Sequence, residues 1–98
     1  MNPATIFKIH KIHNIRLQLW QEVIGIYEGL SSSGNPILKI NGTNREVDIP
    51  DVALDQVLNK LSEVSLGDVV SILRTDNLDQ PFLVRTVGTE QIHKTLKG

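Results

Sequence analysis

The sequence predicts one small domain that is mostly β structure with a single helix. Ile, Leu and Val dominate its apolar residues, while aromatic residues make up only 4% of the chain, and this composition favours strands. Apolar and polar residues alternate in short segments that are separated by Gly, Pro and Asn. Only one segment has apolar residues at helical spacing. A chain of 98 residues is also too short for two independent cores.

The first predicted strand is long and strongly curved and covers residues 15–28. Its apolar residues occupy odd positions at first and even positions later: Ile15, Leu17, Leu19, Ile24 and Ile26. A bulge or sharp bend at residues 21–25 reconciles the two halves, and Gly25 is the residue type that such a bend favours.

A hairpin is predicted around Asn41 and Gly42. Residues 31–36 combine Ser, Gly, Asn and Pro and therefore predict a loop before it. Asn-Gly between two alternating segments, residues 37–40 and 44–49, is a strong signal for a two-residue type I′ turn. The core-facing side chains are then Leu38, Ile40, Val47 and Ile49. The outward-facing side chains are Lys39, Asn44, Glu46 and Asp48.

The single amphipathic helix is predicted after Pro50. Its apolar face consists of Leu54, Val57, Leu58 and Leu61. Asp51 is expected to act as its N-cap. Two strands follow, at residues 69–74 and 82–87, with a turn-rich loop between them and Gly88 as the end of the last strand. Residues 89–96 are expected to form a short terminal helix.

This order is similar to that of the OB-fold, a five-stranded barrel that carries its ligand surface on strands two and three. The predicted helix lies between strands three and four, as it does in that fold. Another small barrel of the SH3-like type and an open α+β sheet are the alternatives. The barrel-like domain is expected to span residues 15–88, after a basic amino-terminal arm at residues 1–14 and before a tail at residues 89–98.

Composition excludes several classes of protein. Because the chain has no cysteine, it cannot form a disulfide framework, a thiolate metal site or a thiol nucleophile. No segment reaches the roughly 20 apolar residues that cross a bilayer, and residues 1–13 lack the apolar run of a secretory signal. We therefore expect a cytoplasmic protein that does not act at a membrane.

No catalytic, cofactor or metal site is predicted. His10 and His13 are three residues apart, but zinc needs three or four ligands. Asp48, Asp51 and Asp55 lack the glycine-punctuated loop of a calcium site, and the helix dipole favours acids at a helix start in any case. No serine lies in a nucleophile motif, and no cofactor motif is present. We expect a non-catalytic binding domain.

Charge is unevenly distributed, although the net charge is only -1. The first 21 residues contain three Lys or Arg and no acid, whereas residues 48–79 contain seven acids and two bases. On a barrel, a basic groove with an exposed aromatic ring binds single-stranded DNA or RNA. The candidate nucleic-acid-binding residues are Lys8, Lys11, Arg16, Trp20, Lys39, Asn44, Arg45, Arg74 and Arg85.

The alternative function is that of a protein-interaction or structural subunit. The predicted outer face of the hairpin carries acids beside Lys39 and has no aromatic residue, which counts against nucleic acid. A free strand edge or the apolar residues of the amino-terminal arm would then bind a protein partner or a second copy of the chain. Those residues are Ile6, Phe7, Ile9 and Ile12. Trp20 and Tyr27 are, by default, expected to pack in the core or at its rim.

Overall fold

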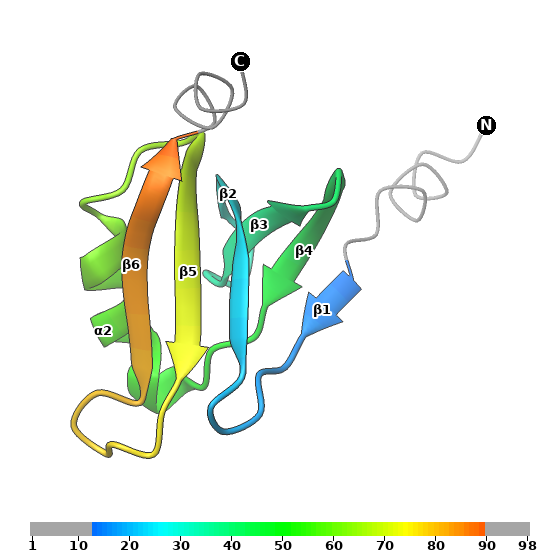
Figure 1. Cartoon of the computed structure of the whole chain (residues 1–98). Helices are drawn as coiled ribbons and strands as arrows, with labels where there is room; N and C mark the ends of the chain where they lie inside the picture. Colours follow the sequence, from blue (N-terminus) through cyan, green and yellow to red (C-terminus); the bar gives the residue numbers. More distant parts are fainter. Residues whose placement is uncertain (1–12, 90–98) are drawn as a thin grey trace.

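The computed structural model describes residues 13–89 (Figure 1). Within them lie β1 His13–Ile15, β2 Glu22–Leu30, β3 Pro36–Ile40, β4 Thr43–Val47, α2 Asp51–Leu61, β5 Asp68–Arg74 and β6 Phe82–Thr89. The prediction of a mostly β domain with one helix is confirmed for this part of the chain. Lys8, Lys11 and the helix expected towards the carboxyl terminus lie outside the described residues.

The six strands form one mixed sheet in the order β1-β4-β3-β2-β5-β6. Neighbouring strands are antiparallel except β1 and β4, which are parallel. Since β1 and β6 form the two edges and do not pair with each other, the sheet is open. The predicted five-stranded barrel is therefore not confirmed. Periodicity reveals which residues face a core, but it carries no information on whether the first and last strands meet.

The predicted long first strand is in fact two strands, β1 and β2. The change in the apolar pattern marks a turn between them, closed by a hydrogen bond from the Gln21 amide to the Gln18 carbonyl oxygen (3.0 Å). β1 pairs with β4 at one edge, whereas β2 lies inside the sheet. For this reason the helix follows the fourth strand rather than the third.

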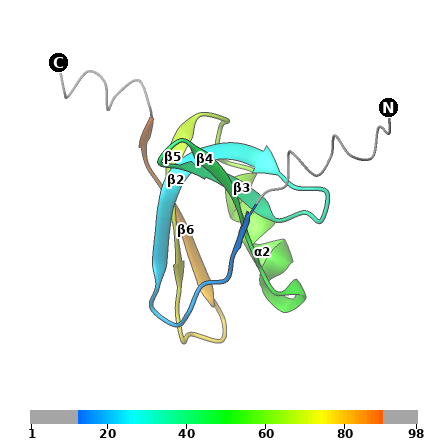
Figure 2. The same ribbon diagram turned by 90° about the vertical axis from the view of Figure 1, so that its right-hand side faces the viewer.

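β2 is strongly bent, as predicted for this part of the chain. Residues 22–26 pair with β5 and residues 26–30 pair with β3, and Figure 2 shows the end of β2 turning across the top of the molecule. A Cβ atom on Gly25 would come within 2.8 Å of the carbonyl oxygen of Lys39. Glycine thus permits the close approach of two strands where the sheet curls.

β3 and β4 form the predicted hairpin. Asn41 and Gly42 have φ angles of 53° and 78°, the positive values that a type I′ turn requires. Leu38 and Val47 are fully buried, whereas Lys39 on the opposite face is exposed. The predicted division of the hairpin into a core face and a solvent face is confirmed.

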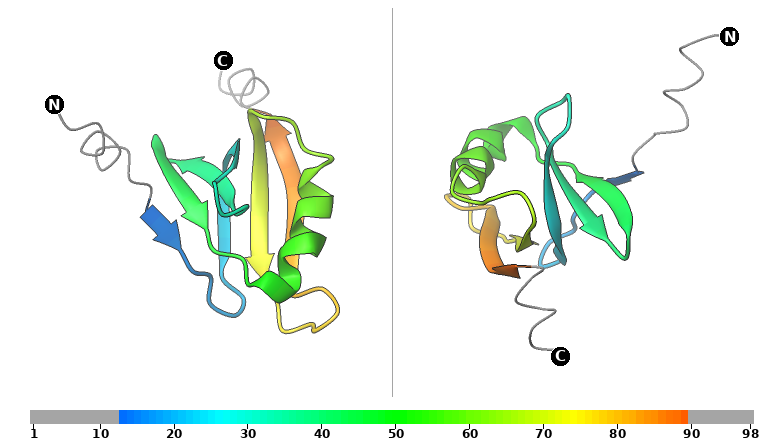
Figure 3. Two further views of the ribbon diagram at one scale, coloured as in Figure 1. Left: turned by 180° about the vertical axis from the view of Figure 1, so that it is seen from behind. Right: turned by 90° about the horizontal axis from the view of Figure 1, so that it is seen from above.

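α2 packs against one face of the sheet (Figure 3). Its N-cap is Pro50 and no side chain caps it, so the expected capping role of Asp51 is wrong; Asp51 lies in the first turn. The buried positions are Ala53, Val57 and Leu61, flanked by the half-buried Leu54 and Leu58. The predicted apolar face is therefore confirmed and extended to Ala53. No helix within residues 13–89 has the length and apolar character needed to cross a membrane.

β5 and β6 pair as an antiparallel hairpin around the predicted loop at residues 75–81. Gly88 does not end the last strand as expected. Val69 pairs with Gly88 and Val70 with Thr86, so Val87 is the extra residue of a β-bulge. Glycine within a strand often marks such a bulge rather than the end of the strand.

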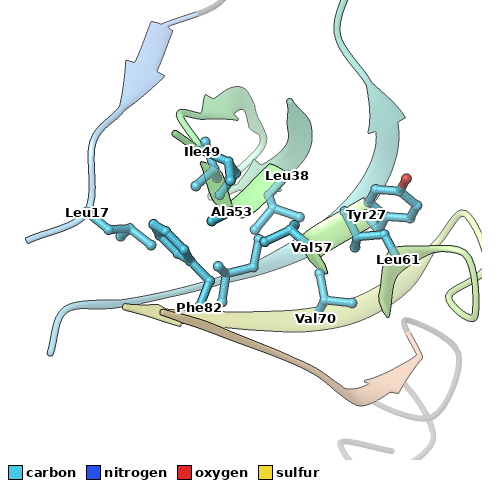
Figure 4. Packing of buried hydrophobic residues seen from close by; sticks show 11 residues of the cluster. Leu17, Tyr27, Leu38, Ile49, Ala53, Val57, Leu61, Val70 and Phe82 are labelled. Atoms are coloured by element: carbon cyan, nitrogen blue, oxygen red, sulfur yellow. The ribbon is translucent and has the colours of Figure 1, made fainter. Parts of the chain in front are cut away.

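The core lies between α2 and the inner face of the sheet (Figure 4). Its buried side chains come from β2 to β6, from α2, and from the segments that flank these elements. Leu17 and Phe82 lie together at one end of the cluster, and Tyr27 lies towards the other. Burial raises the pKa of the Tyr27 phenol above its ordinary value by desolvation.

Candidate functional site

The turn between β1 and β2 holds Trp20 in an unusual backbone conformation. Trp20 is the third residue of the turn at residues 18–21, and its φ is +63°. A positive φ at this position is the mark of a type II turn, which favours glycine. In a residue other than glycine this backbone conformation costs about 1–2 kcal/mol.

Backbone hydrogen bonds join this turn to the end of β5. The Trp20 amide donates to the Arg74 carbonyl oxygen (2.7 Å), and the Arg74 amide donates to the Gln21 carbonyl oxygen (3.0 Å). Trp20 and Gln21 therefore both lie opposite Arg74. This is the arrangement of a β-bulge, in which the first residue is normally glycine. The Gln18 amide also donates to the Gln21 side-chain oxygen (2.8 Å). The position of Trp20 is thus fixed by the backbone around it.

Four large apolar side chains are exposed at this end of the molecule, which is the lower end in Figure 1. Their exposed fractions are 55% for Leu19, 60% for Trp20, and 96% for both Val52 and Leu78. They come from the turn before β2, the first turn of α2 and the loop between β5 and β6. We call these four residues the apolar end. Single exposed apolar residues are common, but several that gather at one end of a molecule are a feature of interaction sites.

A cavity of about 330 Å³ is lined by three of these four residues, Leu19, Val52 and Leu78. Its lining is mainly apolar and comprises Leu19, Pro50, Val52, Ala53, Arg74, Thr75, Asp76, Asn77, Leu78, Pro81 and Phe82. A second cavity of about 360 Å³ shares Pro50, Arg74 and Phe82 with it and extends to Arg16, Leu17, Asp48 and Ile49. The 330 Å³ cavity lies at the lower limit of size for sites that bind small organic molecules. Its volume suits one or two side chains of a partner.

The loop that carries Leu78 is braced by its own hydrogen bonds. The Thr75 amide donates to the Pro81 carbonyl oxygen (2.7 Å), and the Thr75 hydroxyl donates to the Gln80 carbonyl oxygen (2.7 Å). From α2, the Gln56 side-chain amide donates to the Asp79 carbonyl oxygen (2.8 Å). Since the loop is already ordered, a ligand that contacts Leu78 loses less free energy to ordering it.

Charged groups surround the apolar end. Arg74 lines both cavities, and its guanidinium donates to the Leu17 carbonyl oxygen (2.8 Å), which ties the segment after β1 to β5. Arg16 and Asp48 line the second cavity. Asp76 lines the first cavity. The cavity linings thus carry two carboxylates and two guanidinium groups. Asp51 and Asp79 are exposed and adjoin the lining residues Val52 and Leu78 in the sequence.

The predicted nucleic-acid-binding residues are only partly brought together. Arg16, Trp20 and Arg74 lie at or beside the two cavities. Lys39 and Asn44 are cross-strand neighbours on the outer face of the hairpin.

The remaining predicted residues lie apart from that end. Arg45 is half-buried opposite Leu38. Arg85 lies 3.7 Å from the Glu22 carboxylate, which also accepts a hydrogen bond from the buried Ser71 hydroxyl. Lys8 and Lys11 lie outside the described residues. Part of the predicted basic surface is therefore dispersed over the molecule or neutralised.

The default expectation that Trp20 and Tyr27 pack in the core or at its rim is confirmed for Tyr27, which is buried. Trp20 is not part of the core, since 60% of its surface is exposed. Leu19, Val52 and Leu78 were not predicted as site residues from the sequence. Leu19 continues an apolar alternation, and Val52 lies beside the apolar positions of a helix, so both resemble core residues. Of these three, only Leu78 could have been identified from the sequence, because it is a large apolar residue within a polar, turn-rich loop.

Among residues 13–89, no group of three or more acidic or histidine side chains is arranged to hold a metal ion. Comparisons with models of known protein families, with curated proteins and with solved structures give no match to this chain.

Proposed function

We propose that this domain is a non-catalytic protein-interaction module whose apolar end holds apolar side chains of a partner polypeptide. The observation that carries the proposal is the exposure of Leu19, Val52 and Leu78 around one cavity, with the exposed Trp20 next to Leu19 in the same turn. These residues contribute little to the folding core, since most of their surface remains in water. A partner that covered them would gain about 25 cal/mol for each Å² of apolar surface removed from water.

Trp20 adds a second argument. A strained backbone conformation persists only where the surrounding structure enforces it, and such residues gather at ligand-binding sites. Here the strain presents the one tryptophan of the chain to solvent rather than to the core. Tryptophan is also among the residues that most often dominate the energy of protein interfaces. Trp20 is therefore the residue on which we expect binding to depend most.

Binding of a single-stranded nucleic acid to an OB-like face is the second candidate, and the exposure of Trp20 favours it. An exposed indole ring can stack on a base, and Arg16 and Arg74 line cavities beside it. The carboxylates of Asp48 and Asp76 line the same cavities and oppose phosphate binding. For this reason we rank the polypeptide first.

Salt dependence tests the second candidate. If oligonucleotide binding occurs, replacing Lys8, Lys11 and Arg16 with Ala should flatten the plot of log affinity against log salt by about 2–3 units, at roughly 0.7–0.9 per lost phosphate contact. Failure of the intact protein to bind a labelled oligonucleotide at low salt removes this candidate.

Peptide selection tests the first candidate. Full-length protein is used to select binders from a random peptide display library, and the recovered peptides are titrated against wild type, Trp20→Gly and Leu66→Ser. Leu66 is a matched control because it is 72% exposed and precedes the start of β5, whereas Trp20 is hydrogen-bonded to Arg74 at the opposite end of that strand. We expect peptides with large apolar residues whose affinity falls roughly tenfold or more in Trp20→Gly and stays unchanged in Leu66→Ser. Recovery of no peptide that distinguishes these variants contradicts the proposal.

A further inference from the structure

We infer that Asn41 is a site of spontaneous covalent modification, at which the folded protein exchanges the side-chain amide for a carboxylate and forms aspartate or isoaspartate. This inference is independent of the function proposed above. Asn41 and Gly42 form the two-residue turn between β3 and β4, and both have a positive φ. Asn41 is also the only Asn of the sequence that a Gly follows.

The reaction joins the Asn41 side chain to the backbone of Gly42. The Gly42 amide nitrogen gives its proton to solvent and forms a bond to Cγ of Asn41, and the Nδ2 group leaves as ammonia. Water then adds to one of the carbonyl carbons of the resulting succinimide ring and breaks its bond to the ring nitrogen. Breaking the bond at Cγ gives aspartate. Breaking the bond at the main-chain carbonyl carbon gives isoaspartate, in which the backbone runs through Cγ.

Both reacting groups are free in the part of the chain that the structure describes. Asn41 and Gly42 are exposed. The ladder of hydrogen bonds between β3 and β4 begins with the flanking pair, Ile40 and Thr43, so the Gly42 amide lies outside it. No other backbone oxygen accepts a hydrogen bond from this amide. Neither the attacking nitrogen nor the Asn41 side chain therefore has to break a hydrogen bond before it reacts.

Gly42 also leaves the attacking nitrogen uncrowded. Any other residue would place a Cβ atom beside that nitrogen, whereas glycine has none and rotates more freely about its backbone bonds. No atom outside residues 41–43 lies within 4 Å of the point where a Cβ on Gly42 would lie. The rest of the molecule therefore does not confine the tip of the hairpin, and the peptide group between Asn41 and Gly42 can rotate as ring closure requires.

The other asparagine residues within residues 13–89 lack one or more of these features. Each is followed by a residue with a Cβ atom or by proline, which has no amide proton. Hydrogen bonds of 2.7, 2.9 and 2.9 Å also hold three of their side chains, those of Asn14, Asn35 and Asn77. The remaining two, Asn44 and Asn59, lie within β4 and α2, where backbone pairing restricts rotation. Asn41 is therefore expected to react first.

The two products differ in their effect on the hairpin. Asp-Gly fits a type I′ turn as Asn-Gly does, so the aspartate form keeps the turn and adds only a negative charge. Isoaspartate inserts an extra backbone carbon, which a two-residue turn cannot accommodate while Ile40 stays paired with Thr43. β4 also holds β1 at the edge of the sheet. The isoaspartate form should therefore loosen β1, β3 and β4 and leave β5 and β6 unchanged.

The test is incubation of the full-length protein in neutral buffer at physiological temperature, followed by proteolysis and mass spectrometry with synthetic peptide standards for both products. We expect the peptide with Asn41 to gain the mass difference between Asp and Asn before the peptides with Asn44, Asn59 or Asn77. Gly42→Ala should slow this gain roughly tenfold or more, because its Cβ atom crowds the attacking nitrogen. Asn41→Gly is the control: Gly-Gly also fits a type I′ turn and has no side chain to react, so its mass should stay constant.

A parallel incubation in denaturing urea shows whether the fold protects the turn. Conversion of Asn41 in urea but not in buffer overturns the inference, because the folded protein is then not modified. Conversion at another described asparagine as fast as at Asn41, or an equal rate in Gly42→Ala, overturns it as well. Amide hydrogen exchange of the separated isoaspartate form should be faster than in fresh protein in β1, β3 and β4 and unchanged in β5 and β6. Equal exchange in all strands contradicts the expected effect on the hairpin.

Discussion

Trp20 occupies a backbone conformation that glycine adopts most easily, and 60% of its surface is exposed. Its backbone strain therefore opposes folding, while its ring gains little from burial in the chain itself. The sequence identifies Trp20 as a candidate because it is the one tryptophan, but it does not reveal the positive φ. That angle follows from the pairing of the turn with Arg74, which is a contact between residues far apart in the sequence.

Replacing Trp20 separates strain from side-chain loss. Trp20→Gly and Trp20→Ala remove the same ring, but only glycine relieves the left-handed conformation. We expect Trp20→Gly to be more stable than Trp20→Ala by about 1 kcal/mol, measured by urea unfolding. Both variants should lose binding of selected peptides. An alanine variant as stable as the glycine variant would contradict the assigned turn.

Gly42 tests the hairpin turn by the opposite substitution. Its φ is +78°, and a Cβ atom there would meet no atom within 4 Å. Any loss of stability in Gly42→Val therefore arises from the backbone conformation rather than from a clash. We expect a loss of about 1 kcal/mol or more in thermal or urea unfolding. Unchanged stability would show that the turn does not have the type I′ geometry.

At the scale of elements, features that depend on local sequence patterns could be predicted, whereas the pairing of the strands could not. The Asn-Gly turn, the loop at residues 75–81 and the apolar face of α2 follow from signals within a few residues. The split of the first strand does not, because a change of phase at residues 20–24 fits both a bulge and a turn. Only the partner of β1, which is β4, distinguishes the two, and strand partners depend on contacts across the chain.

The packing of α2 gives a prediction at this scale. Leu61 is 3% exposed and faces the core, whereas Lys60 beside it in the sequence is exposed. Leu61→Ala should lower the free energy of unfolding by roughly 2–5 kcal/mol through the lost contacts and the cavity left behind. Lys60→Ala should change it by no more than about 0.5 kcal/mol. Equal effects of the two substitutions would show that the helix is rotated from the face described.

At the scale of the whole molecule, the functional surface arises where three segments meet. The turn before β2, the start of α2 and the loop before β6 are far apart in the sequence, and each contributes one or two residues to the apolar end. Arg16, Trp20 and Arg74 could be named from residue type, since arginine and tryptophan are common in binding sites. Leu19, Val52 and Leu78 could not, because the sequence does not show that these three side chains surround one cavity.

The measurement that tests the proposed function most directly is a map of the bound peptide on the protein surface. Backbone amide chemical shifts of the full-length protein are recorded while a selected peptide is added. We predict that the changes concentrate at Leu19 and Trp20, at residues 50–53 and at residues 75–82. Changes centred on Lys39 and Asn44, or along β6 away from Phe82, would contradict the account and place binding on the hairpin face or on a strand edge.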